Sequence, residues 1–283
     1  MIKVIKAGFF TSIQDRGRDG FASIGVPVSG VMDSFSSNLA NNVLNNTLDD
    51  AVLEITFSGC KLEFFTETII CISGGNFSPK INNKSINLNS RIKVFKNDIL
   101  SFGKINSGVR CYLAVKGGFL TDKVLNSRSF YSNVTHQLFI KKGDMLPISS
   151  LKSDLKTSNS SIKNQNAHFQ SQEIACNIGP EFNLLNVSQK KQLESQLFTI
   201  SIDNNRMGYR LVEIIENNLP QILTSAVLPG TVQLTPSGKL IVLMKDCQVT
   251  GGYPRVLQLT NNSISKLSQK TTNEKFFFVF GKH

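Results

Sequence analysis

Arg110-Cys-Tyr-Leu-Ala-Val115 is a short apolar run that ends at a lysine and two glycines. Three further runs share its character, being rich in β-branched or aromatic residues and bounded by Gly, Ser, Lys or Asp: 69–72, 240–244 and 276–280. Runs of this length and composition are typical of β-strands. Because they are apolar at consecutive positions, they predict strands that are buried on both faces or that form barrel walls. The predicted fold class is therefore mainly β.

A short helix is predicted to begin after Asp33, whose side chain is a good N-cap. Phe35, Leu39 and Val43 follow at i, i+4 and i+8, and this spacing places them on one apolar stripe. We expect the stripe to pack on a sheet, with these polar residues facing water: Ser37, Asn38, Asn41 and Asn45. No βαβ alternation follows, which disfavours a doubly wound fold.

The length and composition predict two domains. A chain of 283 residues with 40% hydrophobic content can build two ordinary cores. Residues 151–172 are dominated by Ser, Asn, Gln and Lys, which is typical of a linker or an exposed loop. We therefore expect one domain at 1–150 and a second at 173–283.

The formal net charge of +11 does not by itself predict a nucleic-acid partner. Lysines and arginines occur singly or in pairs, as at Lys141-Lys142, and no basic stripe with interleaved aromatic residues is present. The pattern indicates a solvated lysine-rich surface. A preference for anionic ligands or an acidic partner stays open.

The cysteines, the histidines and the apolar runs predict no disulfide framework, metal site or membrane span. The five cysteines are widely spaced and mostly lie in apolar runs, so we expect buried, reduced thiols. None of the three histidines lies at metal-ligand spacing from a cysteine or another histidine. The N-terminal stretch is broken by Gly8 and predicts a strand and turn rather than a signal peptide. No window is apolar enough to span a membrane, so a cytoplasmic protein is expected.

Two glycine-flanked polar clusters lie early in the chain. Gln14, Asp15 and Arg16 place an amide, a carboxylate and a guanidinium at one predicted turn, and an arginine fork matches a carboxylate ligand. Ser29 and Gly30 lie just before the predicted helix, where backbone N–H groups can hold an oxyanion. Spacing alone favours an ordinary braced loop for the first cluster and an ordinary capped helix start for the second.

Two more clusters lie late in the chain. Asp203-Asn-Asn-Arg-Met-Gly-Tyr-Arg210 carries two arginines around a glycine, which fits a surface turn or a binding loop. Lys245-Asp-Cys-Gln-Val-Thr-Gly-Gly-Tyr-Pro254 contains a glycine pair that permits a close backbone approach. Asp246, Gln248 and Thr250 alternate, so in an extended segment they would form one polar wall. A plain hairpin fits the same pattern.

Taken in order, these clusters resemble the allophanate hydrolase subunit 2 or biotin-dependent carboxyltransferase-like family, which includes the C subunits of 5-oxoprolinases. The resemblance extends from about residue 3 to 260 and is carried by these segments: 11–20, 25–30 with Met32-Asp33, 53–56, 112–118, Gly179-Pro180, 205–208, 227–233, 236–238 and 250–254. The polar linker and the tail at 261–283 match the family loosely.

The resemblance implies a fold of two cyclophilin-like β-barrel domains with a few short helices, facing each other across a cleft. It implies that the chain acts as the C subunit of an ATP-dependent 5-oxoprolinase, a hydrolase that opens 5-oxoproline (pyroglutamate), a small cyclic amide, to L-glutamate. The implied partners are the other two subunits of that enzyme, the kinase-inhibitor-like B subunit together with the A subunit. ATP with Mg²⁺ is the expected cofactor of the complex.

Residue types and motif positions then give the candidate site. The catalytic candidates are two arginines for anion contacts and two aspartates to orient the amide N–H or act as a base: Arg16, Arg206, Asp15 and Asp246. The substrate-binding candidates supply amides, hydroxyls, backbone N–H groups and one aromatic wall: Gln14, Ser29, Gly30, Gly208, Gln233, Gln248, Thr250, Gly251 and Tyr253. No metal ligand is expected.

Two other functions stay open. The chain could be a carboxyltransferase component that acts on urea or a related amide with biotin. It could also be a non-catalytic regulator that binds a kinase-inhibitor-like partner. No biotin-carrier or ATP-grasp sequence is present, so a complete carboxylase is not expected.

Overall fold

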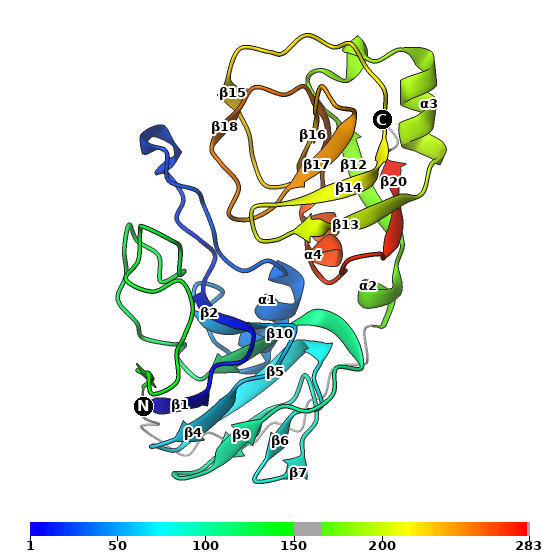
Figure 1. Cartoon of the computed structure of the whole chain (residues 1–283). Coiled ribbons are helices and arrows are strands. Elements are labelled where there is room, and N and C mark those ends of the chain that lie inside the picture. Colours follow the sequence, from blue (N-terminus) through cyan, green and yellow to red (C-terminus); the bar gives the residue numbers. More distant parts are fainter. Residues whose placement is uncertain (150–165, 282–283) are drawn as a thin grey trace. The chain divides into compact units, whose positions relative to one another are not determined.

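The structure is a computed structural model that describes residues 1–149 and 166–281. Its backbone contacts divide the chain into two compact units. The first unit comprises Met1–Arg18 and Ser29–Gln165, and the second comprises Asp19–Val28 and Asn166–His283. The mainly β class with short helices is confirmed (Figure 1).

The strands of the first unit form two sheets that share one core. One sheet has the order β11-β1-β4-β9-β6-β7 and the other the order β2-β3-β10-β5-β8. Apolar side chains of both sheets, such as Leu62 and Leu113, belong to the same buried cluster. The strands are β1 (Ile2–Lys6), β2 (Phe10–Gln14), β3 (Val52–Thr56), β4 (Lys61–Phe64), β5 (Thr68–Asn76), β6 (Lys80–Ile81), β7 (Lys84–Ser85), β8 (Ile92–Val94), β9 (Ile99–Ser101), β10 (Ser107–Val115) and β11 (Met145–Leu146).

Helix α1 (Ser34–Val43) covers the second face of the β10 sheet, packing on β5 and β10. Asp33 caps it by accepting a hydrogen bond from the Ser36 amide, as predicted. The predicted apolar stripe is wrong, because Phe35 is exposed whereas Ala40 and Asn41 are buried. Small side chains let the helix lie close to the sheet, and the Asn41 amide is satisfied by donating to the Asp50 carbonyl. This sheet lies between α1 and the core. Its strands are therefore buried on both faces, which explains why both faces are apolar.

The second unit is built on a closed barrel of strand order β12-β19-β16-β17-β14-β13-β20. Its core includes a cluster of three aromatic rings, Phe198, Phe276 and Phe278. The barrel closes where β12 pairs in parallel with β20. The elements are η1 (Ala22–Ile24), α2 (Asn166–Gln170), β12 (Glu173–Ile178), η2 (Phe182–Leu184), α3 (Val187–Ser195), β13 (Phe198–Asn204), β14 (Gly208–Ile214), β15 (Ser225–Ala226), β16 (Thr231–Leu234), β17 (Lys239–Leu243), β18 (Thr250–Gly251), β19 (Arg255–Leu259), α4 (Asn261–Ser268) and β20 (Lys275–Phe280).

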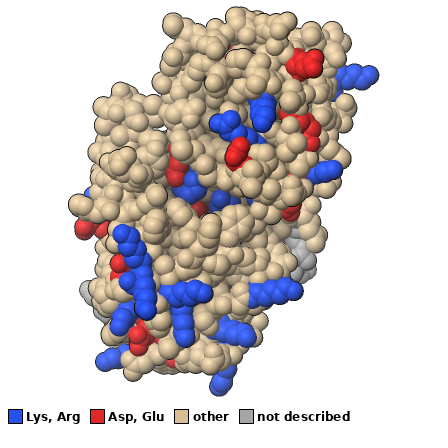
Figure 2. Space-filling view, viewed as in Figure 1, with Lys and Arg blue, Asp and Glu red and all other residues tan. Residues whose placement is uncertain are grey.

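Of the predicted linker, residues 151–172, the part at 151–165 lies outside the described residues. Across 1–149 and 166–281, every helix is too short or too polar to traverse a bilayer. The five cysteines are free and buried, as predicted. Figure 2 shows Lys and Arg side chains at several places on the visible face, with Asp and Glu side chains among them.

Candidate functional site

A pocket on the outside of the second unit's barrel gathers several of the predicted site residues. Its volume is about 680 Å³, within the usual range for small-molecule sites. Four predicted residues line it: Gly208, Gln233, Gln248 and Tyr253. The other lining residues are Asp203, Asn205, Met207, Arg210, Ile241 and Leu243.

The barrel strands explain why these side chains meet. Residues paired directly across a sheet point to the same face. Gln233 on β16 and Arg210 on β14 both pair with Ile241 on the strand between them, so the three side chains form one row. Gly208 and Leu243 form the next pair on the same face. The floor of the pocket is apolar, because Ile241 and Leu243 pack with Val227 and Cys247.

Arg206 and Asp246 form a buried bidentate pair beside this pocket. The Arg206 Nε atom lies 2.7 Å from Asp246 Oδ2, and its Nη2 atom lies 2.9 Å from Oδ1. The two residues are 8% and 5% exposed. The Asp246 amide also donates to the Arg206 carbonyl over 2.8 Å, so the pair ties the segment before β14 to the turn after β17. Their predicted catalytic roles stay predictions, but the paired geometry serves to hold this end of the pocket.

The alternation expected at Asp246, Gln248 and Thr250 is wrong, because the segment turns instead of running extended. The Cys247 amide donates to the Met244 carbonyl over 3.1 Å and closes that turn. As a result Asp246 points to Arg206 and Gln248 lines the pocket, whereas Thr250 is exposed on β18.

Gly251 lies directly against the Gln233 side chain. A Cβ atom at Gly251 would come within 2.5 Å of Gln233 Nε2. The neighbouring Tyr253 is 37% exposed and forms part of the pocket wall. The absence of a side chain at Gly251 therefore provides the space that the Gln233 amide occupies.

Glu181 and Arg255 anchor the chain next to Tyr253. Arg255 donates to both carboxylate oxygens of Glu181, from Nε over 2.9 Å and from Nη2 over 2.8 Å. Its backbone amide donates to the same carboxylate over 2.8 Å. The hydrogen bonds from Arg255 hold the pKa of the Glu181 carboxyl below its usual value. The anchor therefore requires a charged Glu181.

The early candidates form a second cluster within the first unit. The Val31 amide donates to the Asp15 carbonyl over 3.0 Å. This hydrogen bond joins the loop at residues 14–16 to the loop at residues 29–33. A Cβ atom at Gly30 would lie 2.8 Å from the Arg16 carbonyl oxygen, and Gly30 has φ +89°. Ser29 is fully buried and has φ 59°. The Gln14 amide is buried and donates to Ser12 Oγ over 3.0 Å.

Asp15 is surrounded by donors. Its Oδ1 atom accepts from Ser127 Oγ over 2.6 Å, from Ser129 Oγ over 2.7 Å and from the Gly17 amide over 2.8 Å. Its Oδ2 atom accepts from the Arg128 amide over 2.6 Å. These contacts bind the first loop to residues 127–129. They give Asp15 a bracing role, while its predicted role as a base stays a prediction.

Arg16 is the most exposed of the predicted catalytic residues. Its side chain is 63% exposed, and its Nη1 atom lies 3.6 Å from the exposed Asp49 carboxylate. An ion pair of this kind contributes little to stability. Arg16 is thus accessible to an anionic ligand.

A buried polar network beneath the Ser29–Asp33 loop was not predicted. Glu54 Oε2 accepts from the Met32 amide over 2.8 Å and from the Tyr112 hydroxyl over 2.9 Å. The Tyr112 hydroxyl in turn accepts from the Asp33 amide over 2.8 Å. Burial and the Glu54 charge raise the pKa of Tyr112 well above its ordinary value, so the phenol keeps the proton that it donates. Glu54 interrupts an otherwise apolar strand, and that interruption is the sequence signal that could have identified it.

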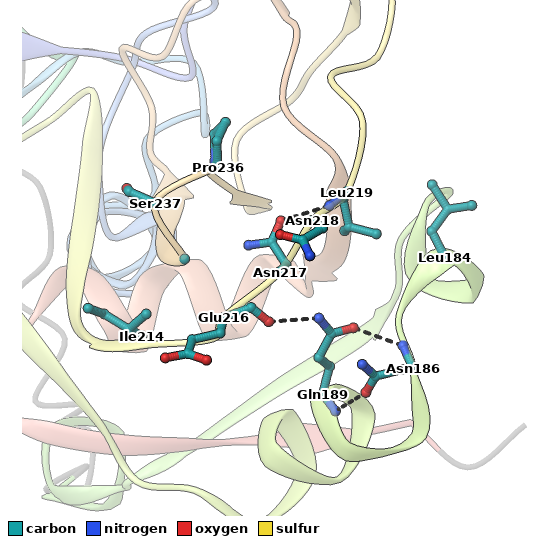
Figure 3. A pocket seen from close by; sticks show the side chains of 11 residues that line it. Leu184, Asn186, Gln189, Ile214, Glu216, Asn217, Asn218, Leu219, Pro236 and Ser237 are labelled. Atoms are coloured by element: carbon teal, nitrogen blue, oxygen red, sulfur yellow. Dashed lines mark hydrogen bonds between the residues drawn. The ribbon is translucent and has the colours of Figure 1, made fainter.

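A second pocket, of about 670 Å³, lies elsewhere on the second unit (Figure 3). Three of its four lining amide side chains, those of Asn186, Gln189 and Asn217, are engaged by the protein itself. Gln189 donates to the Glu216 carbonyl over 2.8 Å and forms a capping box with Asn186. Asn217 donates to two carbonyls and accepts from the Leu219 amide over 3.2 Å. The barrel pocket with Gln233 is therefore the better candidate site.

The candidate residues do not form a metal centre. Within 1–149 and 166–281, no three His, Cys, Asp or Glu side chains are grouped to hold a metal ion. The barrel pocket has one lining guanidinium, Arg210, and one lining carboxylate, Asp203. A triphosphate with its Mg²⁺ needs several cationic or backbone donors, so ATP does not fit this pocket.

Residues 24–280 match the family described as "Carboxyltransferase domain, subdomain A and B". The chain belongs to this family, in agreement with the predicted resemblance. It is 30% identical to the C subunit of Escherichia coli 5-oxoprolinase, over 99% of this chain and 91% of that protein. It is 27% identical to the C subunit of Haemophilus influenzae 5-oxoprolinase, over 95% and 87%. These relatives are named as subunits, so the family includes components of enzyme complexes.

Urea amidolyases are also similar. The Lachancea kluyveri urea amidolyase is 43% identical over 46% of this chain, but the match covers 7% of that protein. The crystal structure of the Kluyveromyces lactis urea amidolyase matches with a TM-score of 0.85 at 28% identity, over 98% of this chain and 18% of that chain. The structure of TTHA0988 matches in fold with a TM-score of 0.88 at 23% identity, and this chain spans 55% of it.

Proposed function

We propose that this chain is the C subunit of a cytoplasmic, ATP-dependent 5-oxoprolinase that opens 5-oxoproline to L-glutamate together with its A and B subunits. The observation that carries the proposal is the near full-length match to the C subunit of Escherichia coli 5-oxoprolinase, at 30% identity. The barrel pocket supplies a site with two amide side chains for a small cyclic amide.

The roles within the pocket follow from its contacts. Gln233 and Gln248 offer amide groups to the substrate amide, and Tyr253 forms one wall. The Arg206–Asp246 pair positions the loop that carries Gln248. ATP supplies the driving force for opening a stable lactam. Because the pocket residues do not fit a triphosphate, we assign ATP and Mg²⁺ to a site supplied with the partner subunits.

The second candidate is a carboxyltransferase component that acts on urea or a related amide with biotin. The 43% identity to the Lachancea kluyveri urea amidolyase favours it over part of the chain. Urea amidolyase also matches over 98% of this chain at 28% identity, but this chain spans 18% of that protein, whereas it spans 91% of the Escherichia coli 5-oxoprolinase C subunit. We therefore prefer the lactam as substrate.

The test is reconstitution. The chain is co-expressed with the subunits encoded beside it, and glutamate released from 5-oxoproline is measured with and without ATP. We expect ATP-dependent release that requires this chain. Release that depends on bicarbonate and biotin with urea as substrate would support the second candidate instead. A tight complex with no turnover of either substrate would make the chain a regulator.

A further inference from the structure

We infer that Arg210 binds the substrate carboxylate in the barrel pocket and makes the site selective for an anionic amide, with Gln233 binding the amide group. The inference rests on the proposed function, and it assigns a residue that lies outside the predicted site set. The sequence prediction assigned anion binding to Arg206. In the structure, the arginine that lines the pocket is Arg210.

The two arginines of the Asp203–Arg210 segment differ in what they contact. Arg206 is buried and its guanidinium is committed to the Asp246 carboxylate. Arg210 is exposed and lines the pocket. Within the described chain, no side-chain hydrogen bond or ion pair engages its guanidinium. Arg210 therefore has a free planar fork of the kind that matches a carboxylate.

Gln233 provides the second group. It is 1% exposed and lines the same pocket, and among the described residues its Nε2 atom has no hydrogen-bond partner. A buried donor left unsatisfied is unfavourable by about 1–3 kcal/mol, so such groups are normally paired. A ligand carbonyl oxygen in the pocket would satisfy this donor.

Arg210 and Gln233 lie on the same face of the barrel, one on each side of β17. Arg210 and Gln233 flank Ile241 on adjacent strands, so their backbones are separated by two strand spacings, or about 10 Å. Both side chains line the same pocket, and the Gln233 Nε2 atom lies against Gly251. 5-Oxoproline carries on one small ring both of the groups that this pair would bind, a carboxylate and an amide oxygen. Urea has no carboxylate and leaves the Arg210 fork unused.

Asp203 acts against carboxylate binding in the same pocket. It lines the pocket, but no ion pair joins it to Arg210 in the part of the chain that the structure describes. Its negative charge weakens the attraction of the site for a carboxylate. Removing that charge should therefore improve the binding of an anionic substrate.

The experiment compares two substrates in the reconstituted complex: 5-oxoproline, and 2-pyrrolidinone, which has the same lactam ring without the carboxylate. For Arg210→Gln we expect kcat/KM for 5-oxoproline to fall about 10- to 100-fold, as for the loss of a charged hydrogen bond, with 2-pyrrolidinone turnover unchanged. Arg210→Lys should be intermediate, because it keeps the charge and loses the fork. Asp203→Asn should lower the KM for 5-oxoproline.

The control is Lys239→Gln, which removes an equal charge from the same strand as Ile241 without touching the pocket lining. It should leave both substrates unaffected. Gly251→Ala should lower turnover of both substrates, because the new methyl group displaces the Gln233 amide.

Each outcome separates the two proposals. Equal losses for both substrates in Arg210→Gln, or no loss, would overturn the role of Arg210 while wild-type glutamate release keeps the proposed function standing. A rise in KM for Asp203→Asn would also count against it. A wild-type complex that releases no glutamate from 5-oxoproline would remove the proposed function itself.

Discussion

Replacing Arg206 with alanine should destabilise the second unit by about 3–5 kcal/mol. The variant leaves the Asp246 carboxylate buried without its bidentate partner, and breaking a buried pair from one side is unfavourable by this amount. The contacts give a similar figure, because two charge-assisted hydrogen bonds at 2.7 and 2.9 Å contribute about 1.5–3 kcal/mol each.

The assay is urea unfolding followed by far-UV circular dichroism, since the chain contains no tryptophan. Hydrogen exchange at β14 and β17 assigns the loss to the barrel. Asp246→Ala should be similarly destabilised, and the double variant should show a coupling energy of roughly 2 kcal/mol or more. Lys239→Ala, at an exposed position on β17, serves as the matched control and should stay within about 0.5 kcal/mol of wild type.

A small effect would refute this reasoning. Suppose that the free energy of unfolding of the Arg206→Ala variant is within about 1 kcal/mol of the wild-type value, but turnover is abolished. The guanidinium then acts on the substrate and not on the fold. Loss of stability with turnover retained at low temperature would instead identify the pair as structural.

Three further outcomes are expected. Gly30→Ala should destabilise the first unit by about 2 kcal/mol or more in urea titrations, because a methyl group meets the Arg16 carbonyl at a positive φ. The pKa of Glu181 is depressed in the folded state, so its contact with Arg255 stabilises the fold above the unfolded pKa and is lost as pH falls through the folded value. Thermal melts below pH 5 should show this loss in wild type and a flatter profile in Glu181→Gln. Burial raises the pKa of Cys60 to about 12, and the other buried thiols are likewise raised, so native protein should resist iodoacetamide at pH 8 and react fully only when unfolded.

The strands could be predicted because their composition reflects burial on both faces. Arg110–Val115 packs one face on the shared core and the other under α1, and both faces are apolar for that reason. The helix stripe could not be predicted from periodicity, because Asn41 satisfies its amide locally and can then be buried. Hydrophobic patterns do not reveal such pairings.

Part of the lining of the candidate pocket could be predicted from the sequence. Gln233 and Gln248 were selected from separate motifs, and they line one pocket. Sequence spacing could not tell which arginine of the Asp203–Arg210 segment is committed to a partner. That distinction depends on Asp246, which is distant in sequence and is brought to Arg206 by the turn after β17.

The parallel pairing of β12 with β20 has a consequence for synthesis on the ribosome. The first strand of the second unit cannot complete its ladder until the last strand of that unit has emerged, because β20 bridges β12 and β13. Until β20 is made, the nascent barrel therefore has an open edge, and Phe198 lacks its two aromatic partners, Phe276 and Phe278. Ribosome stalling before residue 275 should yield a species that chaperones retain, and release of the final strand should free it.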